Sequence, residues 1–324
     1  MDAGRPVSPS SRKPSTTSTR KSSATPSRKS SVAIVGAGRL GTALASALDA
    51  CGYDVRALVS RGAAGARRAA ASVGLKTLAL GAGELERLPT VELLFITTPD
   101  DALNETVALL ASLAESRARV ALHTSGALSS EVLAPLRARG YGVGSMHPLA
   151  AVSEPTAGAR SLRQAFYCVE GDAAAVRAAR RVVRDLGGRS FSIKPEDKAL
   201  YHASALITAG HTVALFDIAA ALLARCGLSE REARRVLLPL LRSAVENLSR
   251  QPPERALTGT FARGDAETVR KHLAALGDAG DTEALSAYTL LGGRSLRLAA
   301  LRGDADDARL ADIARLLAES FGVG

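Results

Sequence analysis

The 324-residue chain is 46% hydrophobic and 23% charged, a length and composition that allow two domains with a sizeable core and exclude a fibrous protein. Its three cysteines, Cys51, Cys168 and Cys226, are far apart and show no CxxC spacing, so we expect neither disulfides nor a metal site. We find no run of about 18 to 20 uninterrupted apolar residues and no apolar secretory signal. The chain is therefore expected to be soluble and cytoplasmic, without a membrane partner.

The formal net charge of +10 is concentrated at the N-terminus. Residues 1–30 hold seven Lys/Arg and one Asp, which contribute +6. This segment is rich in Ser, Thr and Pro with almost nothing apolar to bury, so it is expected to be a disordered basic tail. A solvated tether is the simplest interpretation, and contact with nucleic acid or another anionic surface is the alternative. Over the whole chain, the aromatic content of 3% and the absence of Trp argue against base-stacking nucleic-acid modules.

A dinucleotide-binding fingerprint follows the tail. Residues 31–35 are a short β-branched run typical of a buried parallel strand, and a GxGxxG segment comes directly after it. In such a turn the first glycine permits the tight bend, the second lets the backbone approach a pyrophosphate, and the third lets the helix pack on the strand. The helix N-terminus then faces the phosphates. The expected pyrophosphate-binding residues are Gly36, Gly38, Arg39, Leu40 and Gly41.

The end of the second expected strand, residues 54–59, indicates which nucleotide is bound. An NAD site would place an acidic residue there for the ribose hydroxyl, but this chain has Ser60 and Arg61. A hydroxyl and a guanidinium suit the extra 2′-phosphate of NADP, with Arg67 and Arg68 close behind. The alternative is that these arginines form a solvated basic helix face. We predict NADP as the cofactor.

A βαβ series continues through the N-terminal half, which predicts a doubly wound, mainly parallel sheet. Its expected elements are strands at 76–80, 92–97, 119–123 and 141–146 and a helix at 101–113. Ligands of such sheets bind beyond the carboxyl ends of the strands. That rule adds a set of polar strand-end residues to the expected cofactor site, namely Thr97, Thr98, Pro99 and His123, with Ser125 beside the substrate.

Two further residues at strand ends have structural interpretations. Asp100 is expected to cap the helix that follows it. His147 precedes Pro148 and ends the sixth strand, either as a rigid turn residue or as a ligand. A linker around 153–160 is expected next, followed by a strand at 165–169, a helix at 172–186 and a strand at 189–193. The Rossmann domain is thus expected to span 31–194.

Residues 195–324 are expected to form a helical domain for substrate binding and dimerisation. Lys198 and His202 are four residues apart on its first helix and so share a face. Reduction of a carbonyl or imine needs a proton for the atom that becomes negative, which Lys198 can donate while His202 orients the substrate. The alternatives are that Lys198 is an ordinary surface lysine and that His202 is an interior histidine whose hydrogen bonds are satisfied within the fold.

Four separated motifs resemble one branch of the Rossmann-like oxidoreductases, the one with a C-terminal domain of unknown function. They begin at His123 (HTSGA), Ser145 (SMHPL), Lys198 (KALYHA) and Leu257 (LTGTFARGD). The resemblance implies a fold akin to ketopantoate reductase, pyrroline-5-carboxylate reductase and β-hydroxyacid dehydrogenases, with an all-α domain like the C-terminal one of 6-phosphogluconate dehydrogenase. It also implies a nicotinamide cofactor and a homodimer built through the C-terminal helices.

The turn at 263–265 carries the last candidate residues. Asp265 is expected to cap a helix, and Arg263 with Thr258 is a candidate to hold a substrate carboxylate. The functional hypothesis is an NADP-dependent oxidoreductase acting on a small carbonyl or imine, a keto acid among the options, with Lys198 as proton donor. The alternative hypothesis is a catalytically inactive NADP-binding regulatory or scaffold protein.

Overall fold

The computed structural model describes Met1 and residues 29–321, so nearly all of the predicted disordered tail lies outside the described residues. The chain divides into two compact units, Met1–Lys198 and Ala199–Gly324. The division falls after Lys198, four residues beyond the expected start of the helical domain at Pro195.

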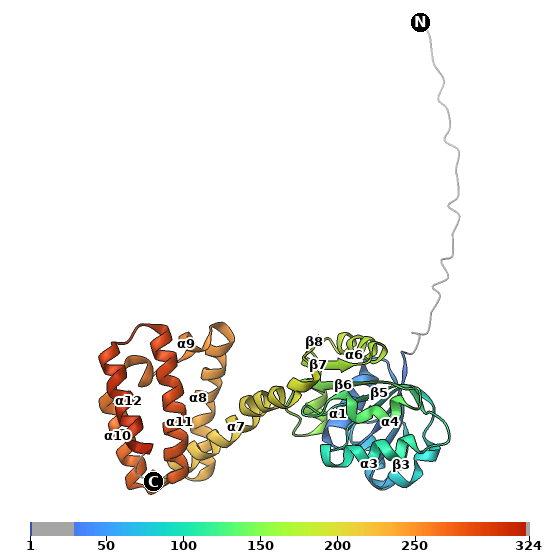
Figure 1. Ribbon diagram of the computed structural model, residues 1–324, viewed down its shortest axis with the longest axis horizontal. Helices are drawn as coiled ribbons and strands as arrows, with labels where there is room; N and C mark the ends of the chain where they lie inside the picture. The colour runs from blue at the N-terminus through green and yellow to red at the C-terminus, as the bar shows by residue number, and fades with distance from the viewer. Residues whose placement is uncertain (2–28, 322–324) are drawn as a thin grey trace. The chain divides into compact units, whose positions relative to one another are not determined.

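The N-terminal unit is built on one eight-stranded sheet with the order β3-β2-β1-β4-β5-β6-β7-β8 (Figure 1). All neighbouring strands are parallel except β6 and β7, which run antiparallel, so the sheet is mainly parallel as predicted. The strands are β1 (Ser31–Val35), β2 (Asp54–Ser60), β3 (Leu78–Gly81), β4 (Val91–Ile96), β5 (Ala118–His123), β6 (Gly142–Pro148), β7 (Phe166–Gly171) and β8 (Arg189–Phe191).

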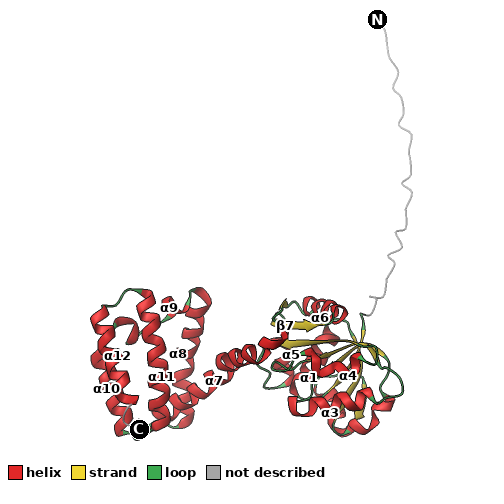
Figure 2. Ribbon diagram, in the orientation of Figure 1, coloured by secondary structure: helices red, strands yellow, loops and turns green. Residues whose placement is uncertain are grey.

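Helices cover both faces of this sheet (Figure 2). One apolar core packs strands against α1 (Arg39–Ala50), α2 (Ala63–Ser72), α5 (Pro155–Leu162) and α6 (Ala173–Asp185). The other core packs against η1 (Ala82–Arg87), α3 (Asp100–Ala111), η2 (Ser130–Leu133) and α4 (Ala134–Arg137). Because β1 and β4 are buried on both faces, their residues read as continuous apolar runs rather than an alternating pattern.

One expectation for the end of this unit is wrong, and another is confirmed. The expected linker at 153–160 is mostly helix α5, which packs on α1; a Cβ at Gly158 would come within 3.1 Å of Ala43 Cβ, so this glycine permits the close approach. His147 and Pro148 are the last two residues of β6, opposite Cys168 and Tyr167 of β7, so His147 ends the sixth strand as expected. The pairing of β6 with β5 ends at Ser145, so a proline at position 148 costs no hydrogen bond to β5.

After η3 (Pro195–Asp197), the C-terminal unit is helical, as predicted. Its elements are α7 (Lys198–Arg225), α8 (Glu230–Arg250), α9 (Pro253–Ala256), η4 (Phe261–Arg263), α10 (Ala266–Asp278), α11 (Thr282–Arg302) and α12 (Asp307–Phe321). A small core forms around Val269, Ile313 and Leu317. Asp265 caps α10 by accepting a hydrogen bond from the Thr268 amide, as expected from its position.

One helix differs from the expectation of no membrane-spanning segment. Pro195–Arg225 is long and apolar enough to cross a bilayer by length and composition, with a mean hydropathy of 1.8 in its most apolar window. Only 6% of that window is buried within the chain. The rule of uninterrupted apolar residues missed it because Ser, Thr, His and Gly are scattered along it, although residues 199–216 contain no Asp, Glu, Lys or Arg.

Candidate functional site

The glycine turn between β1 and α1 has the geometry of a phosphate-binding loop. Gly36 has φ +112°, and a Cβ there would lie 2.6 Å from backbone atoms of Thr97 and Thr98. A Cβ at Gly41 would lie 2.2 Å from the Gly36 carbonyl oxygen, so α1 packs directly on the turn. Gly38 has nothing within 4 Å of its Cβ position, and no side chain caps α1. The turn is therefore tight on its inner side and open on its outer side, next to free amide donors.

The carboxyl end of β2 carries a second uncapped helix N-terminus. Gly62 precedes α2, and no side chain accepts from the first amides of this helix. The Ser60 hydroxyl donates to the Gly62 carbonyl at 2.7 Å, which leaves its oxygen free only to accept. Arg61 is exposed at this end of the strand. An anion here would find donors in the α2 amides and the Arg61 guanidinium rather than in Ser60.

A buried polar cluster lies at the carboxyl ends of β5 and β6 and in the loop after β5. It includes seven of the nine buried polar or charged side chains among the described residues. Polar groups are rarely buried unless they are hydrogen-bonded or functional, so their concentration marks this end of the sheet. The seven are His123, Thr124, Ser125, Ser130, Ser145, Glu170 and Lys198.

The Ser125 side chain organises the loop after β5. Its hydroxyl donates to Asp100 Oδ2 at 2.9 Å and accepts from the amides of Ala127 and Leu128 at 3.2 and 3.0 Å. The expected capping role of Asp100 is wrong, because Pro99 occupies the N-cap and α3 begins at Asp100 itself. The carboxylate is instead aimed at Ser125. The Ser125 hydroxyl thus donates one hydrogen bond and accepts two, and these bonds hold the loop after β5 in its conformation.

Two of the predicted cofactor residues present buried polar atoms without hydrogen-bond partners among the described residues. These atoms are Thr98 Oγ1 and His123 Nε2. The other ring nitrogen, His123 Nδ1, accepts from the Ser125 amide at 3.1 Å, which places the proton of the neutral ring on Nε2. Burial, together with the Lys198 charge, lowers the pKa of His123 to about 3, so the ring stays neutral. Thr98 Oγ1 and His123 Nε2 are thus buried polar atoms at the ends of β4 and β5, and a backbone hydrogen bond with Ser129 partly opposes the lowering of the His123 pKa.

Lys198 is buried in the N-terminal unit, with 1% of its surface exposed. Its Nζ donates to Ser145 Oγ at 2.9 Å and to the Ser125 carbonyl at 3.1 Å. The interpretation of this residue as an ordinary surface lysine is therefore wrong. Burial lowers the pKa of Lys198, and the nearby Cys168, Glu170 and Asp100 oppose that shift.

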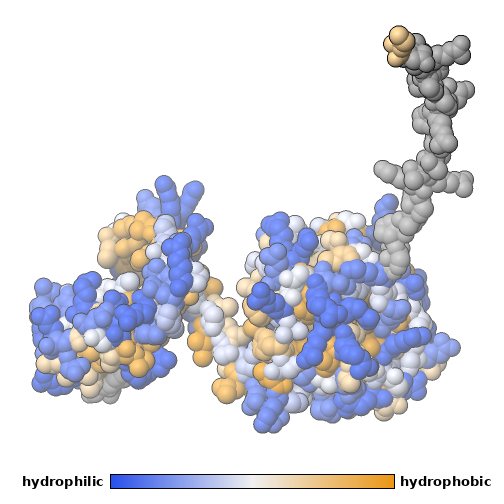
Figure 3. All heavy atoms as spheres, turned by 90° about the horizontal axis from the view of Figure 1, so that it is seen from above, coloured by the Kyte–Doolittle hydropathy of each residue, from blue (hydrophilic) through white to orange (hydrophobic). Residues whose placement is uncertain are grey.

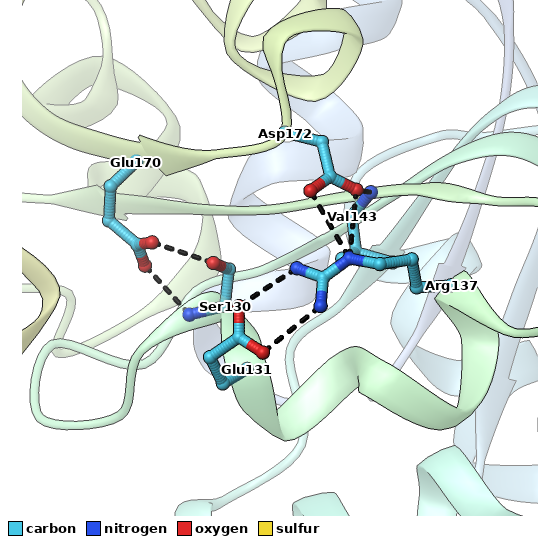
Figure 4. A network of polar contacts seen from close by, with 6 residues as sticks. All are labelled: Ser130, Glu131, Arg137, Val143, Glu170 and Asp172. Atoms are coloured by element: carbon cyan, nitrogen blue, oxygen red, sulfur yellow. Dashed lines mark hydrogen bonds and ion pairs between the residues drawn. The ribbon is translucent and has the colours of Figure 1, made fainter.

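Glu170 and Ser130 belong to this cluster but had no signal in the sequence. Glu170 accepts from the Ser130 amide at 2.8 Å and from its hydroxyl at 2.7 Å, which ties η2 to β7 (Figure 4). Beside them, Arg137 bridges Glu131 and Asp172. The partners are 40 residues apart, so only the fold brings them together. Ser145 was likewise seen only as part of a motif, and its contact with Lys198 emerges from the structure.

The remaining predicted residues lie in the C-terminal unit. His202 lies on α7 one turn beyond Lys198, after the division between the units. Arg263 lines an open cavity of about 400 Å³ at the start of α10, together with Arg309 and two acidic side chains. Among the described residues, no group of three or more His, Cys, Asp or Glu side chains could hold a metal ion.

Sequence-family models match both units. Residues 14–148 match a Rossmann-like domain, and residues 165–295 match a domain of unknown function, DUF2520. A search of curated proteins finds no significant match.

Solved structures with the same fold include several reductases. A candidate NADP oxidoreductase from Bacteroides fragilis is 22% identical, with a TM-score of 0.67 over 82% of this chain and 97% of its own. An imine reductase from Streptomyces aurantiacus is 18% identical, with a TM-score of 0.56 over 89% and 99%. A pyrroline-5-carboxylate reductase from Coxiella burnetii is 12% identical, with a TM-score of 0.52 over 90% and 98%. The chain is thus distantly similar to NAD(P)-dependent oxidoreductases.

Proposed function

Because the chain joins a Rossmann-like domain to a DUF2520 domain, we propose that it is an NADP-dependent oxidoreductase that reduces a small carbonyl or imine, a keto acid among the candidates. The observation that carries this proposal is the buried Lys198 ammonium, held by Ser145 and the Ser125 carbonyl and close enough to His123 to lower its pKa, in a sheet that also carries an open glycine turn. These features favour a ligand with phosphates at one end and a reacting group at the other.

The residues present fit a nicotinamide dinucleotide. The pyrophosphate takes the free amides at the start of α1, contributed by Arg39 and Leu40 beside Gly38. The 2′-phosphate takes Arg61 and the α2 amides. At the other end, Thr97, Thr98 and Pro99 follow β4 and His123 is the last residue of β5, so these residues would lie beside the nicotinamide. When bound, the cofactor supplies a hydride from C4 of its nicotinamide ring.

Lys198 holds the proton that the substrate needs. Desolvation destabilises its charged form and lowers its pKa, which makes the ammonium a stronger acid than an exposed lysine. Ser145 and the Ser125 carbonyl orient Nζ, and the Asp100 contact holds the loop that carries Ser125. In this proposal Ser125 positions the substrate through that loop, and His202, one turn beyond Lys198 on the same helix, orients the substrate.

Titration of the purified protein with NADPH and NADH tests the cofactor assignment. We expect NADPH to bind more tightly, and Arg61→Ala to weaken NADPH about 10- to 100-fold while leaving NADH nearly unchanged, because a charge-assisted bond to phosphate contributes about 1.5 to 3 kcal/mol. Arg56→Ala is the matched control, since Arg56 lies on β2, five residues before Arg61, but pairs with Asp54. If neither nucleotide binds below millimolar concentration, the glycine turn is only structural and the proposal fails.

We also propose that the protein is a homodimer held by its C-terminal helices. Several large apolar side chains of α7, α8 and α11 are exposed, and Figure 3 shows hydrophobic side chains at the surface of the C-terminal unit. Among them are Ile207, Val213, Leu240 and Leu290, with exposures of 62, 70, 68 and 68%. Exposed apolar surface on a helical unit favours an interface with a partner.

Light scattering after size exclusion tests the dimer with the double variant Ile207→Asp/Val213→Asp. The wild type is expected to be dimeric and the variant monomeric or at least tenfold more weakly associated, because two buried carboxylates would have to lose water. Leu109→Asp, an exposed leucine on α3, serves as the control. A monomeric wild type contradicts the proposal, and recovery in the membrane fraction would assign α7 to a bilayer instead.

A further inference from the structure

Three buried residues on neighbouring strands form a row across the sheet at the Lys198 site. His123 of β5 is paired with Ser145 of β6, and Ser145 is paired with Glu170 of β7. Paired residues on adjacent strands project from the same face of a sheet. Their exposed fractions are 0, 0 and 6%, so the whole row lies inside the fold.

The Lys198 ammonium reaches the middle residue of this row. Its Nζ donates to Ser145 Oγ at 2.9 Å. Residues directly opposite each other on antiparallel strands have Cβ atoms about 4.5 to 5.5 Å apart, so the Glu170 side chain begins next to the serine that holds Nζ. The row therefore places a carboxylate on the strand at one side of Ser145 and the His123 imidazole on the strand at the other side.

Lys198 needs a compensating negative charge. Only 1% of its surface is exposed, and a charged group is costly to bury without an opposite charge. Its own helix supplies none, because Lys198 is the first residue of α7, at the positive end of the helix dipole, and no acidic residue stands in the first turn. His123 is neutral, since burial lowers its pKa to about 3. The compensating charge has to come from another element.

Glu170 is the best placed of the neighbouring titratable groups. Burial lowers the pKa of Lys198, and the groups that oppose this shift are Cys168, Glu170 and Asp100. Burial raises the pKa of the Cys168 thiol, which is therefore uncharged at neutral pH. Asp100 is exposed, so water screens its charge. His147, opposite Cys168 on β6, is a base and supplies no negative charge. Glu170 is the one acid among these groups that is buried.

Hydrogen bonds hold the Glu170 carboxylate at the end of the row. Its Oε1 accepts from the Ser130 amide at 2.8 Å, and its Oε2 accepts from the Ser130 hydroxyl at 2.7 Å (Figure 4). A donor on each oxygen suits an ionised carboxylate, which can only accept. The side chain is thus a fixed negative charge and not a mobile one.

We propose that Glu170 is the buried counter-charge that holds Lys198 as an ammonium ion, and that it is a positioning residue for the proton donor. The second part rests on the proposed function, in which Lys198 gives its proton to the substrate. Without the Glu170 charge, burial would favour the neutral amine, which has no proton to give. Glu170 therefore extends the working pH range of the site toward higher pH.

NMR titration of the full-length protein labelled with ¹³C-lysine tests the counter-charge without cofactor or substrate. The Cε resonance of Lys198, assigned by its absence in Lys198→Met, reports the pKa of this side chain. In Glu170→Gln this pKa is expected to fall by about 1 to 2 pH units, because an opposite charge within about 4 to 6 Å shifts a pKa by roughly 1 to 3 units. Glu170→Asp is expected to lower it less, since the charge is kept on a shorter side chain.

Glu131→Gln and Ser130→Ala are the matched controls. Glu131 is exposed and pairs with Arg137, so its substitution removes one negative charge beside the row and not within it. Ser130→Ala removes a hydroxyl that bonds Glu170 but keeps the carboxylate. Both are expected to leave the Lys198 titration within about 0.5 pH units of the wild type, since exposed charges are screened. An equal fall in either control, or an unchanged titration in Glu170→Gln, overturns the proposal.

A double-mutant cycle of urea midpoints provides a second test, which allows for a loss of stability in Glu170→Gln. Removal of one member of a buried pair leaves the other charge uncompensated. The variant Lys198→Met/Glu170→Gln is therefore expected to lose less than the sum of the two single losses. Additive losses contradict the role of Glu170 as counter-charge.

Turnover tests the positioning role separately. With a substrate that the wild type reduces, activity is lost as the pH rises through the pKa of Lys198, and in Glu170→Gln this high-pH limb of the kcat profile is expected to move to lower pH by the same amount as the NMR titration. A limb that stays in place while the Lys198 titration moves overturns the positioning role. Absence of NADPH binding in the wild type instead overturns the oxidoreductase assignment, so the two failures are distinguishable.

Discussion

Gly41→Ala is expected to destabilise the N-terminal unit by about 3 kcal/mol, because overpacking of a close contact typically costs 1 to 3 kcal/mol and no flexible atom can yield here. The new Cβ would lie 2.2 Å from the Gly36 carbonyl oxygen and 2.4 Å from Thr97 Oγ1. Both atoms are held in place, since Thr97 Oγ1 donates to that same carbonyl at 2.7 Å. Urea denaturation followed by circular dichroism measures the loss as a lower transition midpoint.

Gly38→Ala is the matched control, because it is expected to lower NADPH affinity while leaving the stability of the N-terminal unit nearly unchanged. Nothing lies within 4 Å of its Cβ position, so its free energy of unfolding is expected to change by less than about 1 kcal/mol. NADPH affinity should nevertheless fall at least tenfold, because the methyl group would occupy the space that the pyrophosphate needs. Normal NADPH binding by Gly38→Ala, or wild-type stability of Gly41→Ala, would show that the turn is not used as argued.

Lys198→Met is expected to lower turnover at least 100-fold while NADPH affinity stays within about threefold of the wild type. Removal of a general acid typically costs 10²- to 10⁴-fold in rate, and methionine keeps the apolar stem that fills the site. Turnover is measured as NADPH oxidation with a panel of 2-keto acids and cyclic imines, using any substrate that the wild type accepts.

Lys194→Met is the control for this substitution, since Lys194 is exposed and only four residues earlier. Retained turnover in Lys198→Met would make the buried ammonium a structural group that ties Ser145 to the loop after β5. NADPH binding without turnover of any substrate by the wild type would favour the regulatory alternative. The two results are distinguishable, because the second appears before any substitution is made.

Much of the cofactor half is predictable from local sequence. The apolar run before Gly36 and the GxGxxG spacing identify a strand, a turn and a helix, and the structure contains all three. These features depend on backbone conformation and on contacts between residues close in sequence. The absence of an acid near Arg61 is likewise visible in the sequence, and the nucleotide preference that it indicates is still a prediction.

Other features could not be read in this way. The Pro and Gly of residues 153–160 predict a linker, but tertiary contact with α1 stabilises this segment as helix. The position of Asp100 before a helix predicts a capping role, whereas its carboxylate accepts a hydrogen bond from Ser125, 25 residues away.

By itself, the sequence determined the mainly parallel sheet, the glycine turn, the helical second half and the family resemblance, because periodicity and motif spacing encode local structure. Only the tertiary structure decided the state of Lys198. A lysine on a helix is most often solvated, but the partners of Nζ come from positions 53 and 73 residues away and enclose it. Burial and hydrogen bonding depend on such distant contacts, and these determine whether a charged group is an ordinary surface residue or the centre of a site.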